Sequence, residues 1–185
     1  MYDRDHGASR IPMKEKYQTL HFPNNIDIRT MQRCGGTTMR HVWQFIHTGN
    51  YQKMGLAERY AEYRKHGVDG MGFRKGSYRI TIIRPQMDRL VSVAAYRGYE
   101  NINTVLENIE DYDDHHFDSY TDRLGLPEHY DKIYELDNID KLVVSLGVKP
   151  YHTNQGNYEP VEISDAAIEA CKRRYKADIE NGWWT

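Results

Sequence analysis

The sequence predicts an α/β protein in which helices flank a central, mostly parallel sheet. Residues 26–32, 78–84 and 130–136 have the alternating or β-branched pattern of strands. Each is followed by a segment in which apolar residues recur at helical spacing. Strands that alternate with helices usually pair in parallel, so the pattern indicates one α/β domain over residues 26–185.

The helices are expected where this spacing lies between caps and glycines. The first strand leads through a glycine turn into a helix that starts around Met39 and ends at Gly49. Pro85 stands just inside the start of a later helix, and Ser164 can cap the last one. After the first helix, the sequence predicts helices at residues 50–66, 87–99, 102–109, 140–146 and 164–181. Gly67 is expected to end the helix at residues 50–66. Residues 1–25 are polar, contain two prolines and are expected to form an irregular leader.

Composition excludes several classes of protein. The 185 residues include 39% hydrophobic and 28% charged residues, which is typical of a folded domain. No stretch of 18 apolar residues could span a membrane, and the first residues lack the apolar core of a signal peptide, so a cytoplasmic location is expected. Two cysteines, Cys34 and Cys171, cannot form a disulfide framework.

Charge is distributed unevenly, although the net charge is only −2. Residues 58–97 contain nine Lys or Arg and four acidic residues, whereas acids dominate residues 100–140. A local basic zone in a near-neutral protein indicates a polyanionic ligand at one site rather than a nucleic-acid surface. Two solvated faces of opposite charge would explain the same pattern.

A glycine loop between the first strand and its helix is the strongest chemical signal. It reads Arg33-Cys34-Gly35-Gly36-Thr37-Thr38-Met39. Glycines let successive N–H groups turn inward, the helix N-terminus attracts anions, and the hydroxyls and arginine add donors. This predicts a phosphate or sulfate site without the Walker lysine pattern. A plain turn with a threonine cap is the alternative.

A second signal of the same kind begins at Arg84, where the next strand ends, and continues to Ser92 on the following helix. Arginine can bind a phosphate through two parallel hydrogen bonds, and a helix-borne hydroxyl can add a third. Ligands collect outside the carboxyl ends of parallel strands. The two turns are therefore expected to serve one crevice.

Together these segments resemble the PAPS-dependent sulfotransferase family, especially its carbohydrate-modifying branch. That family has a Pro-Lys-x-Gly-x-Thr-Thr-like loop and then a strand ending Arg-Asp-Pro-x-x-Arg-Leu-x-Ser-x-Tyr. This chain has the same spacing of eight residues from Arg84 to Ser92. Residues 116–125, 130–140, 152–154 and 175–180 resemble later pieces of the family in the same order, so the likeness covers most of residues 26–182.

The resemblance implies a P-loop NTPase-like three-layer fold. It also implies transfer of a sulfuryl group from 3′-phosphoadenosine 5′-phosphosulfate (PAPS) to a hydroxyl or amine, with the bisphosphate PAP as product and no metal. The acceptor would be a small molecule or glycan, most simply a carbohydrate. The implied donor-binding residues are Arg33, Cys34, Gly35, Gly36, Thr37, Thr38, Met39, Arg84 and Ser92.

Catalysis would need a cation at the leaving group and a general base. Arg33 would supply the charge. His66 is the first choice for the base, with Glu62 and then Glu58 as competitors.

The chain departs from the family pattern in three ways: Arg33 replaces the usual lysine, Pro85 comes one position early, and the chain is short. The short length implies that acceptor-binding elements are trimmed or are supplied by another subunit of a homo-oligomer. Arg33 and the short length favour a rival interpretation, a nucleotide-binding or assembly protein without turnover. A nucleotide kinase is a further rival, although the sequence lacks its magnesium-binding pattern.

A histidine-rich segment, Asp113-Asp114-His115-His116, is a formal metal candidate. Consecutive residues are not expected to face one ion, and the usual ligand spacing is absent. The segment is therefore interpreted as an acidic, solvated turn. The resemblance to the sulfotransferases implies that His116 or Phe117 packs near the nucleotide crevice.

Overall fold

The fold was analysed in a computed structural model that describes residues 19–51, 61–62, 65, 72–150 and 160–184. These residues form one sheet with strand order β1-β2-β3-β4. The strands are β1 (Thr19–Phe22), β2 (Ile26–Thr30), β3 (Tyr78–Ile83) and β4 (Lys132–Glu135). β2 pairs in parallel with β3, and β3 with β4, whereas β1 is antiparallel to β2. The prediction of an α/β protein with a mostly parallel sheet is confirmed.

Strand β1 lies within the segment that was expected to be an irregular leader, so that expectation is wrong for Thr19–Phe22. Leu20 and Phe22 are buried and contribute to the main core. The hairpin turn before β2 contains Asn24 and Asn25, whose φ values are 58° and 57°. Asparagine adopts this left-handed conformation more readily than most residues, which allows the chain to reverse.

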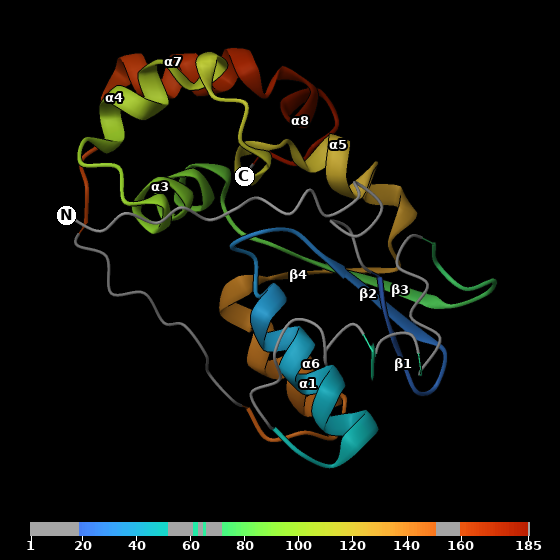
Figure 1. The fold of residues 1–185 in the computed structure, drawn as a ribbon. Coiled ribbons are helices and arrows are strands. Elements are labelled where there is room, and N and C mark those ends of the chain that lie inside the picture. Colours follow the sequence, from blue (N-terminus) through green and yellow to red (C-terminus); the bar gives the residue numbers. More distant parts are fainter. Residues whose placement is uncertain (1–18, 52–60, 63–64, 66–71, 151–159, 185) are drawn as a thin grey trace.

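One face of the sheet is apolar and is covered by two helices. Ile28, Ile80 and Ile82 alternate onto this face and pack against α1 (Gly36–Thr48) and α6 (Ile139–Ser145). Figure 1 shows the two helices together beneath the strands. Their packing holds the start of α1 at the end of β2.

The opposite face is covered by later parts of the chain. Ile83 and Ile133 meet α5 (Tyr120–Leu124) and Trp183, which follows α8 (Lys176–Glu180). Next to them, α3 (Gln86–Arg97), α4 (Ile102–Glu107) and α7 (Asp165–Arg174) share a separate apolar cluster. In Figure 1 this group lies on the other side of the sheet from α1 and α6. Four short 3-10 helices complete the described elements: η2 (Ile109–Asp111), η3 (His115–Phe117), η4 (Pro127–His129) and η5 (Leu136–Asn138).

Most predicted helices occur close to their expected bounds, and two expectations need correction. The single helix expected at residues 164–181 is wrong, because the chain leaves helical geometry at Tyr175 and continues as α8. The Tyr175 side chain is buried, and its hydroxyl donates a hydrogen bond to the carbonyl of Phe117. Pro85 precedes α3 as its N-cap instead of occupying the first helical position. The expected helix at residues 50–66 and its stop at Gly67 lie largely outside the described residues.

Within the described part of the chain, no helix is both long and apolar enough to cross a membrane.

Candidate anion-binding site

The two turns that the sequence singled out meet in the structure. β2 and β3 are adjacent and parallel, so the loop after β2 and the start of α3 lie at the same edge of the sheet. The Nε of Arg33 donates a hydrogen bond of 3.0 Å to the Oγ of Ser92. Two candidate residues that are 59 positions apart are thus in direct contact.

The loop after β2 depends on its two glycines. Gly35 has a φ of 76°, and a Cβ there would lie 2.5 Å from the Cδ1 of Ile139 in α6. A Cβ on Gly36 would lie 2.9 Å from the Oγ1 of Thr30. The first-turn N–H groups of a helix have no intrahelical partner, and the N-cap of α1, Gly35, has no side chain that could cap them. The loop therefore presents a helix N-terminus, which suits an anion.

Arg33 is held from two sides. Its φ is 64°, an unusual conformation for a residue other than glycine. Its guanidinium lies 4.8 Å from the centroid of the Tyr96 ring, one turn beyond Ser92 on α3. The charge is therefore fixed at the junction of the two turns instead of extending into solvent.

Tyr120 connects the loop after β2 with the residue that follows β3. Its hydroxyl donates to the carbonyl of Arg84 at 2.8 Å, accepts from the Arg84 N–H at 3.1 Å, and lies 3.2 Å from the Sγ of Cys34. Burial raises the pKa of the Cys34 thiol and of the Tyr120 hydroxyl, so both stay protonated at neutral pH. Because its own hydrogen goes to Arg84, the Tyr120 oxygen accepts the hydrogen of the thiol.

Arg89, the other arginine of the second turn, has a structural role. It is fully buried and donates to the carbonyls of His116 and Asp118, both at 2.9 Å. Its Nε donates to Gln86, which in turn donates to the buried carboxylate of Asp178 in α8. This network anchors the start of α3, so that the position of Ser92 is set by buried contacts.

The remaining predicted residues divide into two groups. Thr37 and Thr38 lie in the first turn of α1, half-buried, and Thr37 accepts a hydrogen bond from Arg40. The side chains of Cys34 and Met39 are fully buried in the cores below the loop, so only their backbone faces the site. Glu62 forms an ion pair of 3.7 Å with Lys65. Glu58 and His66 lie outside the described residues.

Sequence reasoning missed Tyr96 and Tyr120. Tyr96 is 58% exposed on α3, one turn after Ser92, and this i, i+4 spacing could have indicated it. Tyr120 begins α5 behind the N-cap Ser119, which accepts from the Asp122 N–H. The Ser-x-x-Asp pattern reveals that helix start, but not the long-range contacts of the tyrosine.

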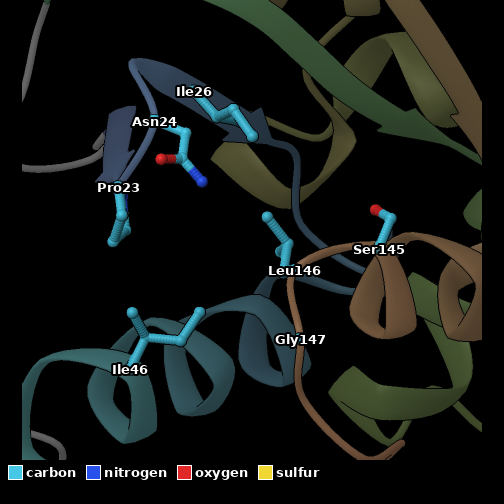
Figure 2. A pocket seen from close by; sticks show the side chains of 7 residues that line it. All are labelled: Pro23, Asn24, Ile26, Ile46, Ser145, Leu146 and Gly147. Carbon is cyan, nitrogen blue, oxygen red and sulfur yellow. The ribbon is translucent and has the colours of Figure 1, made fainter.

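A pocket of about 260 Å³ lies elsewhere, at the beginning of β2. It is lined by Pro23, Asn24, Ile26, Ile46, Ser145, Leu146 and Gly147. Figure 2 shows Asn24, Ile46 and Leu146 projecting toward the space between the β1–β2 turn and the ends of two helices. This lining carries no charge, so the pocket does not suit the polyanion that the basic zone suggested.

Compared with known proteins, the chain matches no family model, no curated protein and no solved structure. The candidate site is therefore judged on its own geometry.

Proposed function

We propose that the protein is a sulfotransferase that moves a sulfuryl group from PAPS to a hydroxyl or amine acceptor, most simply on a carbohydrate. The observation that carries the proposal is the hydrogen bond between Arg33 and Ser92. It joins two strand-to-helix turns, each with a cationic side chain and a hydroxyl, as a ligand with two phosphate groups would require.

In this proposal the two turns divide the donor between them. The loop N–H groups, Thr37 and Thr38 bind the 5′-phosphosulfate, and Arg33 meets the charge that develops on the leaving oxygen. Arg84 and Ser92 bind the 3′-phosphate. The P-loop NTPase-like three-layer fold is part of the same proposal, supported by the glycine loop between β2 and α1 and by helices on both sides of the sheet.

The base that accepts the proton of the attacking hydroxyl is proposed to be His66 or Glu62. Replacing His66 by Ala or Glu62 by Gln separates them, since the base variant loses turnover and keeps donor affinity. Unchanged turnover in either variant eliminates that residue.

Donor binding is tested by thermal unfolding with PAP. At 100 times its dissociation constant the ligand should raise the melting temperature by roughly 5–10 °C, without magnesium. Arg84→Gln should weaken binding about tenfold, because it removes a charge-assisted contact. Arg79→Gln is the matched control and should leave PAP affinity unchanged, since Arg79 lies near the start of β3 whereas Arg84 follows its end.

Radiolabelled transfer from PAPS distinguishes the enzyme from a binding or assembly protein. Arginine at position 33 is the feature that favours the non-catalytic alternative, because it is bulkier than lysine and cannot act as a compact point charge. PAP binding without sulfate transfer to any of a panel of glycans and small hydroxyl compounds would favour that alternative. Absence of PAP stabilisation would refute both the sulfotransferase and a PAP-binding protein without turnover.

A further inference from the structure

Asp114, His115 and His116 come together at the start of η3. One ligand atom of each residue lies within 4.8 Å of the others. Asp114 is the N-cap of this short helix, and its Oδ1 accepts a hydrogen bond of 3.0 Å from the backbone N–H of His116. The Asp114 carboxylate is thus held close to the two histidines that follow it. Consecutive residues were not expected to face one ion, but the capping geometry of Asp114 brings one ligand atom of each residue close together.

The two oxygens of Asp114 have different partners. Oδ2 lies 2.7 Å from the Nε of Arg97, on α3. Oδ1 lies 2.7 Å from the Nδ1 of His116 and 3.4 Å from the Nδ1 of His115. In metal sites a ligating carboxylate commonly has a second partner at its other oxygen, and here the ion pair with Arg97 takes that place.

The segment that carries the cluster is acidic, and Arg97 of α3 is the cation that pairs with it at Asp114. Residues 110–118 contain five acidic residues and no lysine or arginine. All three side chains of the cluster are half-buried, and the two imidazole rings lie 4.1 Å apart. Tyr96 borders the cluster, with its ring centroid 6.0 Å from that of His116.

We propose that Asp114, His115 and His116 bind a divalent zinc-like transition-metal ion. Two nitrogens and one oxygen suit Zn²⁺, whereas Mg²⁺ and Ca²⁺ prefer oxygen ligands alone. Ligands about 2.0–2.2 Å from zinc are separated by roughly 3.3–3.6 Å in a tetrahedron, close to the 3.4 Å between Asp114 and His115. The shorter contact to His116 is a hydrogen bond, so the metal would replace the proton between the two atoms. This inference is independent of the proposed function.

The test is titration of the full-length, chelator-treated protein with Zn²⁺ alone, at neutral pH, by calorimetry. We expect one site of highest affinity, weakened at least about tenfold in His115→Ala and in His116→Ala. His129→Ala is the matched control, because His129 is exposed on η4 and outside the cluster. It should bind Zn²⁺ like the unmodified protein.

Unfolding curves of the alanine variants check that the fold is intact, and the ring signals of the histidines give a second readout. Zn²⁺ should shift the nuclear magnetic resonance signals of His115 and His116 before that of His129. The proposal is overturned if the protein takes up no zinc, if the alanine variants at 115 and 116 bind it as tightly as the unmodified protein, or if the His129 variant loses the same site.

Discussion

The glycine loop shows how one residue can set the shape of a site. Gly35 and Gly49 flank the same helix and have nearly the same backbone conformation, with φ values of 76° and 72°. Their neighbours differ: a Cβ on Gly35 would lie 2.5 Å from Ile139, whereas nothing lies within 4 Å of a Cβ on Gly49. The pair therefore separates the cost of a left-handed backbone from the cost of a steric clash.

We predict that Gly35→Ala lowers the free energy of unfolding by about 2–4 kcal/mol and Gly49→Ala by only about 1 kcal/mol. Both substitutions place a side chain on a left-handed backbone, but only Gly35→Ala forces the buried Ile139 to move. Urea denaturation of the two proteins measures the difference. Equal losses would mean that Ile139 adjusts without cost and that the loop tolerates a side chain at Gly35.

The residues of the candidate site differ in how far the sequence could reveal them. Arg33 and Ser92 follow from the position of polar residues at strand ends, since parallel strands bring such positions to one edge. Tyr120 could not be found this way. Its hydroxyl connects the two strand ends only because a later part of the chain folds back onto the sheet, and no local pattern encodes that return.

At the scale of elements, a buried ion pair holds the β1–β2 hairpin to the segment before β3. Asp27 is fully buried, and its carboxylate accepts from the N–H of Arg74 at 2.6 Å and from the Nε of Arg74 at 2.7 Å. The Nδ1 of His21 on β1 lies 2.7 Å away. Burial alone would raise the pKa of Asp27, but the hydrogen bonds from Arg74 and His21 outweigh it and lower the pKa below its ordinary value of 3.8.

We predict that Asp27→Asn costs about 2 kcal/mol of unfolding free energy at neutral pH, because charged hydrogen bonds are lost. A lowered pKa means that the carboxylate contributes its stability above pH 3.8 and loses it as the pH falls through the folded-state pKa. The stability of the unmodified protein should therefore approach that of the variant in acid. Unfolding curves at several pH values measure this convergence.

Glu169→Gln is the control, because Glu169 also pairs with a cationic side chain, that of Lys172, but is exposed on α7. It should leave stability unchanged at neutral pH. A constant gap between Asp27→Asn and the unmodified protein down to strongly acidic pH would contradict the prediction.

The elements that the sequence predicted well are those with a strong periodic pattern. β2, α1 and α3 each bury one apolar side against a core, and β3 is a run of β-branched residues buried on both sides, so their patterns are visible in the chain. β1 has only four residues and depends on pairing with β2. The break at Tyr175 depends on a distant carbonyl that the tyrosine reaches, and it could not be read from helical spacing.

At the scale of the whole molecule, the last described residues close the fold beneath the candidate site. Trp183 is 1% exposed and donates from Nε1 to the carbonyl of Gly125 at 2.7 Å. Its ring lies 5.7 Å from that of Tyr120 and 6.1 Å from that of Tyr130. Tyr120, whose hydroxyl contacts both Cys34 and Arg84, is thus itself supported by Trp183.

We predict that Trp183→Ala destabilises the protein by about 3–5 kcal/mol, as expected for a large aromatic removed from a core. Trp184→Ala is the matched control: this neighbour is only half-buried, and its loss should cost about 1 kcal/mol. Chemical denaturation followed by circular dichroism avoids using the altered tryptophans as probes. Equal losses would show that the last residues do not support the core. Faster hydrogen exchange at the amide of Arg84 in Trp183→Ala would show that the C-terminal packing supports the candidate site through Tyr120.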